Sequence, residues 1–252
     1  MVIRRISKRL RDHSWFAVLV DLLVVVAGIL IALQLGAWAE ANEDRSLEEA
    51  YLERLAEDLE IERGRMEAAG RYAENRLAAV RLLARIAAEP SLAAAQPSRV
   101  PWAVETATWR SFPQINAYVY RELQSTGRLA LVRSEALRRM LAEHYTALQH
   151  DARVGEDLSA QRRFDAATAG LLTIDELVAV ERAGGDPEDW STPPERAVEI
   201  ADRLARLPAA LAELPGIAQH HTFNLRVIDQ MRARADALLT SLAAERREHD
   251  GR

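Results

Sequence analysis

The fold is decided by one stretch, WFAVLVDLLVVVAGILIALQLGAWA, which runs from Trp15 to Ala39 and contains a single charged residue, Asp21. About 20 apolar residues, at a rise of about 1.5 Å each, cross a hydrocarbon layer about 30 Å thick, so this stretch can span a bilayer with some tilt. Trp15 and Trp38 lie at its ends, where tryptophan is favoured because its ring is apolar and its N–H is polar. The stretch therefore predicts a transmembrane helix over residues 15–39, with the two tryptophans as interface anchors.

The charges around this stretch predict its orientation. Residues 1–14 carry a net charge of +4, whereas the rest of the chain carries −9. Positive charges next to a span stay on the cytoplasmic side. We therefore expect a basic cytoplasmic head over residues 1–14 and a periplasmic domain over residues 40–252, anchored in a bacterial inner membrane. The acidic body argues against nucleic acid as a partner.

A cleavable signal peptide is the alternative interpretation, because Ala37-Trp38-Ala39 resembles a small-x-small cleavage site. The apolar region of a signal peptide has about 7–15 residues. The apolar region from Ala17 to Leu35 is longer than this and contains the charged residue Asp21. Both features favour a retained anchor.

The rest of the chain has the apolar periodicity of helices, with residues recurring every three or four positions. We predict an all-α fold: one N-terminal transmembrane helix followed by an extracytoplasmic helical bundle with long helices. Gly127 is expected to be a left-handed residue after a helix, and Arg128 to Val132 is the one weak strand candidate. The predicted helices are 42–89 (one helix, or two joined near Gly64 and Gly70), 98–109 with Ser98 as N-cap, 117–125, 134–150, 152–183, 194–207 and 215–248.

Two blocks of sequence resemble a known family. The first is Gly28-Ile-Leu-Ile-Ala-Leu-Gln34, with an acid seven residues before it and Trp38 four residues after it. The second begins at Tyr118 and includes Glu122-Leu123, Ser125-Thr126-Gly127 and Tyr145. Together they resemble an uncharacterised family of bacterial single-span membrane proteins that is defined as a domain of unknown function. The resemblance implies a short cytoplasmic head, one span and an external helical domain, and it implies no activity and no catalytic residue.

Small residues line one face of the predicted span. At 100° per residue, Asp21, Gly28 and Ala32 lie within about 20° of one line, with Gly36 within about 60°. Gly28, Ala32 and Gly36 have the small-xxx-small spacing that lets membrane helices approach closely. This face predicts self-association into a homo-oligomer. The alternative is that the small residues face lipid.

Asp21 and Gln34 are the polar residues of the span. A charged aspartate at the bilayer centre costs about 2.5–3.5 kcal/mol on insertion scales, so a deep Asp21 needs a proton or a partner. The alternatives are a proton or cation site in an oligomer, or an interfacial Asp21 paired with Arg11. Gln34 lies on the opposite face and is expected to form an interhelical hydrogen bond.

Residues 40–252 contain no familiar catalytic pattern. The chain has no cysteine, and its histidines lack the two-histidine spacing of a helical metal site. We therefore expect no enzyme activity, no cofactor and no metal, with a metal-dependent enzyme as the weakest alternative. Aromatic residues concentrate between Trp102 and Tyr120; core packing explains them, or they form a binding surface near the predicted 111–116 loop.

The function expected from the sequence is that of a membrane-anchored protein acting by interaction, as scaffold, sensor or accessory subunit. Its expected partners are the lipid bilayer, further copies of itself and, as a further candidate, another membrane or periplasmic protein. The alternative is a proton- or ion-conducting oligomer that uses Asp21.

Overall fold

The structure is a computed structural model of the chain. It describes the backbone over residues 3–154, 158–184 and 191–250, and the side chains over residues 19–151, 158–184 and 191–247. These residues form helices, and the described part contains no strand. The all-α prediction is therefore confirmed, whereas the weak strand prediction at Arg128 to Val132 is wrong because Arg128–Leu131 is a 3-10 helix, η2.

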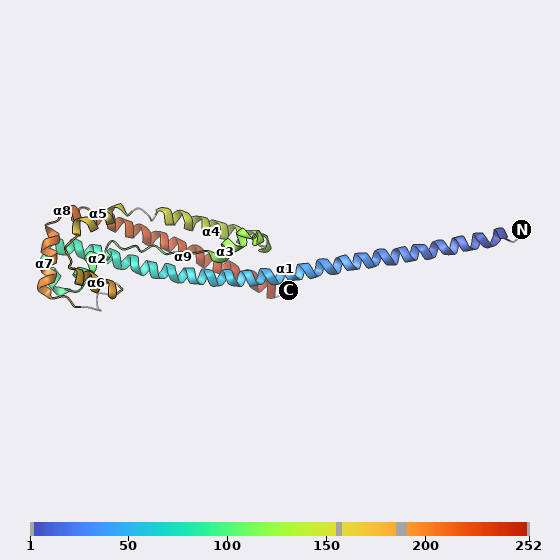
Figure 1. Cartoon of the computed structure of the whole chain (residues 1–252), viewed down its shortest axis with the longest axis horizontal. Helices are drawn as coiled ribbons and strands as arrows, with labels where there is room; N and C mark the ends of the chain where they lie inside the picture. The colour runs from blue at the N-terminus through green and yellow to red at the C-terminus, as the bar shows by residue number, and fades with distance from the viewer. Residues whose placement is uncertain (1–2, 155–157, 185–190, 251–252) are drawn as a thin grey trace. The chain divides into compact units, whose positions relative to one another are not determined.

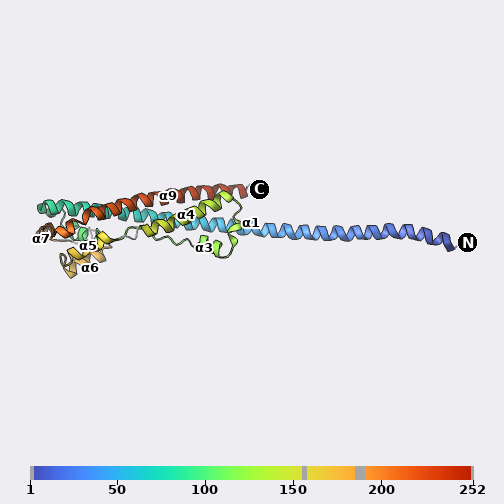
Figure 2. The same ribbon diagram turned by 90° about the horizontal axis from the view of Figure 1, so that it is seen from above.

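The chain divides into two units, Met1–Glu53 and Arg54–Arg252. Helix α1 (Ile3–Ala88) includes the predicted span. Gly64 and Gly70 lie within this continuous helix, so of the two possibilities for residues 42–89 the single helix is confirmed. We call residues 54–252 the helical domain (Figures 1 and 2). Besides the later part of α1 it contains η1 (Pro90–Ala95), α2 (Arg99–Thr106), α3 (Tyr118–Ser125), η2, α4 (Glu135–Val154), α5 (Ser159–Thr168), α6 (Ile174–Arg182), α7 (Pro194–Ala205), α8 (Pro208–Leu211) and α9 (Leu214–Asp250).

Three long helices form one part of the domain core. The later part of α1 lies beside α4 and α9, as both ribbon views show (Figures 1 and 2). Apolar residues at helical spacing face inward from all three helices, which is why the pattern alone predicted a bundle. Their buried members include Leu55, Leu59, Met66, Leu137, Leu141, Met231 and Leu238.

A second part of the core forms where α1 ends. The short helices α2, α5, α7 and α8 pack here around fully buried side chains such as Phe164, Ile200 and Leu204. Arg196 of α7 binds both carboxylate oxygens of Glu176 in α6, at 2.7 and 2.8 Å. This ion pair and the apolar cluster, to which α1 contributes Leu83 and α9 contributes Ile217, hold the short helices in place.

The predicted helix over residues 152–183 is wrong. Helix α4 continues to Val154, and α5 and α6 are separate helices joined by a turn over residues 169–173. Gly170 has a φ of +83°, a left-handed conformation that ends a helix. Thr173 then starts α6 with a capping box, in which its hydroxyl accepts from the Glu176 N–H and Glu176 accepts from the Thr173 N–H.

Other predicted helix ends agree more closely with the structure. Gly127 has a φ of +70° directly after α3, as predicted, and the Ser134 hydroxyl accepts the Leu137 N–H at the start of α4. Ser98 stands at the start of α2 but does not cap it, because its hydroxyl accepts the N–H of Thr192 instead. That helix ends at Thr106 rather than Trp109. Most of the stretch between the predicted helices 152–183 and 194–207, including Trp190, lies outside the described residues.

Candidate functional site

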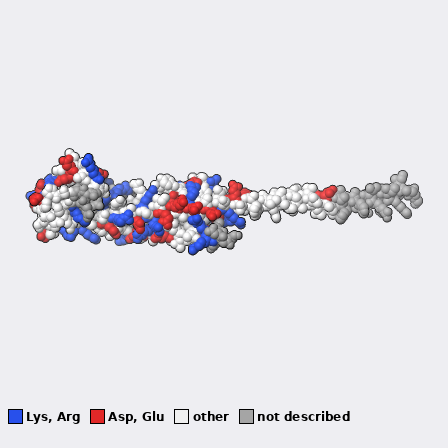
Figure 3. Space-filling view, turned by 90° about the horizontal axis from the view of Figure 1, so that it is seen from below, with Lys and Arg blue, Asp and Glu red and all other residues white. Residues whose placement is uncertain are grey.

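The apolar segment, residues 19–39 as far as side chains are described, exposes all its large apolar side chains. Between Leu19 and Trp38 there are 13 of them, each 40–67% exposed. The space-filling view shows this stretch as uncharged apart from one acidic spot (Figure 3), and Asp21 is its only charged residue. It is the one helical stretch in the described residues that is long and apolar enough to cross a membrane. A surface of this kind needs a non-aqueous environment or a partner.

The residues predicted to associate lie on this exposed helix. A Cβ added at Gly28 or at Gly36 would meet nothing within 4 Å. Asp21, Ala32 and Gln34 are exposed as well. The side chain of Trp15 lies outside the described residues, and Trp38 is 67% exposed. Nothing in the described part of the chain requires a small residue at Gly28 or Gly36, so helix association stays a prediction.

The aromatic residues between Trp102 and Tyr120 differ in their burial. Trp102 and Tyr120 are buried, as core packing predicts, whereas Tyr118 is 66% exposed. The segment between α2 and α3 is not helical over residues 110–117, and it separates two cavities. Core packing therefore explains Trp102 and Tyr120, whereas Phe112 lines both cavities. A binding surface in this region stays a prediction.

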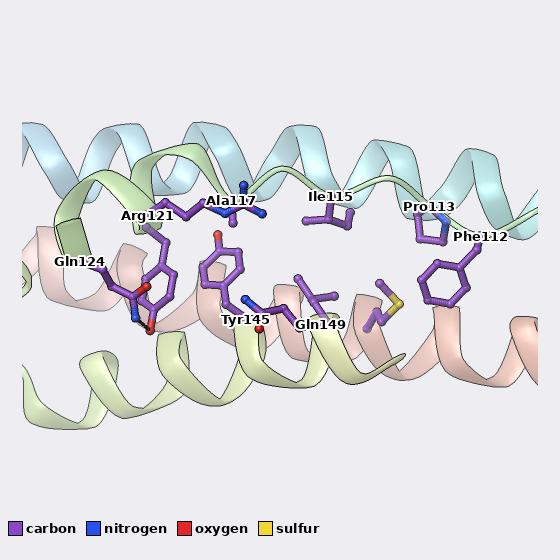
Figure 4. A pocket seen from close by; sticks show the side chains of 11 residues that line it. Phe112, Pro113, Ile115, Ala117, Arg121, Gln124, Tyr145 and Gln149 are labelled. Carbon is purple, nitrogen blue, oxygen red and sulfur yellow. Dashed lines mark hydrogen bonds between the residues drawn. The ribbon is translucent and has the colours of Figure 1, made fainter. Parts of the chain in front are cut away.

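The first cavity, which we call the tyrosine cavity, has a volume of about 200 Å³. Tyr120 of α3 stacks on Tyr145 of α4 with ring centres 4.5 Å apart, and Gln124 donates a hydrogen bond of 2.9 Å to the Tyr120 hydroxyl. Figure 4 shows the segment from Phe112 to Ala117 closing one side while Gln149 comes from α4. The cavity is small and lined by both polar and apolar groups.

A buried polar cluster lies beside this cavity. His144 Nε2 is 3.3 Å from Glu62 Oε2, and both side chains are almost fully buried. Among the described residues, Glu62 Oε1 and His144 Nδ1 have no hydrogen-bond partner. Burial, together with the nearby Glu62 and Asp58 carboxylates, raises the pKa of Tyr145. Tyr145 therefore stays protonated and can only act as a neutral hydrogen-bonding group.

A second buried network joins α9 to the segment after α2. His221 Nε2 lies 2.7 Å from the Ala107 carbonyl oxygen, which requires a proton on that nitrogen. Its Nδ1 is then free to accept from the Ser111 hydroxyl at 3.4 Å, and Asn224 donates to the same hydroxyl at 3.4 Å. Burial lowers the pKa of His221 to about 4, with the charges of His220 and Arg76 acting in the same direction. The neutral histidine fastens this segment to α9.

The arrangement of Ser111 and His221 resembles a nucleophile and its base only in part. A catalytic histidine needs a pKa near the working pH, and burial holds the pKa of His221 far below neutrality. Ser111 is itself 3% exposed. We therefore interpret the pair as a structural anchor.

Arg76 of α1 is a buried cation without an acidic partner. It is 4% exposed, and its guanidinium carbon lies 5.1 Å from the centre of the Trp109 ring and 5.7 Å from that of Tyr72. Within the described residues it has no carboxylate partner, and its Nε lacks an acceptor. Burial lowers its pKa, although arginine keeps its charge. Cation–π attraction supplies about 2 kcal/mol, less than the several kcal/mol that desolvating an ion costs.

The second cavity, which we call the arginine cavity, opens next to Arg76. Its volume is about 480 Å³, and it lies between one face of α1 and the segment at residues 110–116. Two arginines and no acidic residue line it. Arg65 also donates a hydrogen bond of 3.2 Å to the Gln114 carbonyl oxygen. The lining residues are Arg65, Ala68, Ala69, Tyr72, Arg110, Ser111, Phe112, Pro113, Gln114 and Asn116.

Sequence reasoning missed the buried polar groups, although a signal was present. His144 lies between Leu141 and Leu148, and His221 lies four residues after Ile217. Polar residues at positions that the periodicity assigns to the core are expected to be buried and paired. The spacing of a helical metal site is a different signal and does not reveal such buried pairs. In the described part of the chain no group of three or more His, Asp or Glu side chains is placed to hold a metal ion.

Comparisons of the chain with protein-family models, with curated proteins and with solved structures found no match. The class of protein therefore rests on the fold and the surfaces described above: an all-α protein with one candidate membrane helix and a helical domain. The resemblance to a family of single-span bacterial proteins stays a prediction.

Proposed function

We propose that the chain is a single-pass membrane protein whose helical domain acts by interaction, as scaffold, sensor or accessory subunit. The observation that carries this proposal is the contrast in burial: the apolar segment leaves 13 large apolar side chains exposed, while the helical domain buries most of its own. Burying apolar surface yields about 25 cal/mol per Å². A helix with such a surface all round is favoured in lipid.

The orientation that we propose places residues 1–14 in the cytoplasm and the helical domain in the periplasm. Its support is the basic head, which includes Arg4, Arg5 and Lys8, next to the apolar segment. Trp38 and Trp15 then lie at the two interfaces. Membrane fractionation with alkaline washing tests the anchor: the chain is expected to stay with the membrane, and release by the wash would contradict it.

We further propose that the anchor self-associates through the face that carries Gly28, Ala32 and Gly36. Gly36→Leu is expected to weaken association because its side chain would keep the helices apart. Ala37→Leu is a matched control at the same depth, since residue 37 lies about 160° around the helix from Asp21. Cross-linking in native membranes measures the oligomer. Equal association of both variants and the wild type would contradict the proposal.

The alternative function is a proton- or ion-conducting oligomer. It is favoured by one observation, that Asp21 is the only charged residue of the apolar segment. Asp21→Asn keeps the size of the side chain and removes its charge. Proton flux in vesicles with purified protein separates the two functions: unchanged flux with an intact oligomer rules out conduction, whereas lost flux favours it over a purely interacting role.

A further inference from the structure

Arg76 is a buried positive charge with no negatively charged partner among the described residues. Arg76 is 4% exposed, and its guanidinium carbon lies 5.7 Å from the ring centre of Tyr72 and 5.1 Å from that of Trp109. The described residues supply no carboxylate to neutralise it. Buried charges in proteins are paired with an opposite charge or bound to a ligand, since the hydration that they lose must be replaced. No residue in the described part of the chain supplies such a partner to Arg76, so an anion from outside the chain would meet this requirement.

The arginine cavity provides the place for this anion. Tyr72 lines the cavity, and its ring centre lies 5.7 Å from the guanidinium carbon of Arg76, so the buried cation lies close to the cavity wall. Arg65 and Arg110 line the cavity from its two sides, one from α1 and the other from the segment after α2. The positive potential of three arginines adds up in this region, and no acidic residue in the lining opposes it.

The remaining lining indicates what kind of anion fits. Tyr72, Phe112 and Pro113 offer apolar surface, while Ser111 and Asn116 offer hydrogen-bonding groups. The volume of about 480 Å³ lies within the usual range for small-molecule sites. A forked guanidinium binds the oxygens of carboxylates and phosphates particularly well.

We propose that the arginine cavity binds a small soluble oxyanion, a carboxylate or a phosphate compound, whose charge neutralises Arg76. Tyr72 is half-exposed, so it can turn aside and admit the anion to the buried guanidinium. This inference goes beyond the membrane anchor and does not depend on it. It gives the helical domain a ligand that a sensor or accessory subunit would detect.

Binding is tested on the full chain in detergent, by calorimetry with inorganic phosphate, benzoate and citrate at constant ionic strength, with chloride as the reference anion. At least one of the three is expected to bind more tightly than chloride. Arg76→Met and the double variant Arg65→Gln/Arg110→Gln are each expected to weaken that binding at least about tenfold. Arg232→Met is the matched control, because Arg232 is a surface residue paired with Asp229, and it should leave binding unchanged.

Thermal unfolding provides a second readout. A bound anion stabilises the wild type in proportion to its concentration over its Kd, and Arg76→Met should lose this stabilisation while unfolding, without the anion, at no lower temperature than the wild type. If Arg76→Met does not fold, the Arg65→Gln/Arg110→Gln variant decides, since both of its sites are exposed. The proposal is overturned if none of the three anions binds better than chloride, or if the variants bind as tightly as the wild type.

Discussion

The apolar segment and the helical domain are both built from α-helix, but they treat apolar side chains in opposite ways. In the segment, Leu33 and Trp38 are 65% and 67% exposed, whereas in the domain Leu59 and Phe164 are fully buried. The domain alternates apolar with charged residues, so each helix has one inward face. The segment is apolar all round and has no such face. The comparison shows that the distribution of apolar side chains around a helix determines whether the helix packs in a protein core or needs an apolar environment on all sides.

The largest expected effect on stability comes from removing a buried side chain from the core of the helical domain. Phe164→Ala removes a fully buried ring from the second part of the core, and such changes cost about 3–5 kcal/mol in free energy of unfolding. Ile174→Ala is the control, because Ile174 is 79% exposed and its change should stay within about 0.5 kcal/mol. Urea unfolding in detergent measures both. Equal destabilisation would contradict the assigned core.

A charge introduced into the apolar segment should impair its membrane insertion without affecting the fold of the helical domain. Leu30→Arg places a charge in the middle of the predicted span and should cost about 3 kcal/mol of insertion, a factor of about 150. The control is Glu49→Arg, at an exposed position outside the segment. Membrane and soluble fractions are compared by immunoblot. Leu30→Arg should leave the membrane fraction while Glu49→Arg stays, and retention of both would argue against a span.

A smaller effect concerns the polar groups that the domain buries. The folded pKa of His221 is about 4, below the ordinary 6.5, so between these pH values the unfolded chain binds a proton that the folded chain does not. Stability therefore falls as the pH falls from 6.5 to 4, by up to roughly 3 kcal/mol. His221→Gln should remove this part of the pH dependence, and His220→Gln should keep it. Parallel pH profiles for His221→Gln and the wild type would refute the assignment.

The smallest expected effect separates turn glycines from helical ones. Gly127→Ala should cost about 1 kcal/mol, because residue 127 has a φ of +70°. Gly64→Ala, inside α1 with nothing within 4 Å of the added Cβ, should stabilise the domain by about 0.5–1 kcal/mol. Thermal unfolding measures both variants, and the same sign for both would contradict the two assigned backbone conformations.

Much of the fold could be predicted from the sequence, because long amphipathic helices carry a strong periodic signal. The end of the helix predicted over 42–89 and both ends of the last helix were predicted to within a few residues. The predicted start at residue 42 is wrong, because α1 runs without a break from the predicted span to Ala88. The prediction of one continuous helix over residues 152–183 is wrong for a local reason. The apolar spacing of these residues continues past Gly170, although this glycine and the Thr173-x-x-Glu176 capping box both indicated a break.

The candidate sites were less predictable. The pattern places His144 and His221 inside the domain but does not say which polar group each one meets, because Glu62 and Ser111 come from distant parts of the chain. The burial of Arg76 could not be predicted for a similar reason: an arginine on a helix is usually solvated, and its 4% exposure depends on packing against distant residues such as Trp109. Contacts between distant elements require the structure.

The most direct test of the membrane anchor uses the absence of cysteine from the chain. Single cysteines are introduced as Ser7→Cys, Leu30→Cys and Ser46→Cys, and spheroplasts are treated with a membrane-impermeant maleimide. We predict that the residue at 46 is labelled in intact spheroplasts, the one at 7 only after the membrane is disrupted, and the one at 30 in neither case. Labelling at all three positions in intact spheroplasts would contradict a span over residues 15–39.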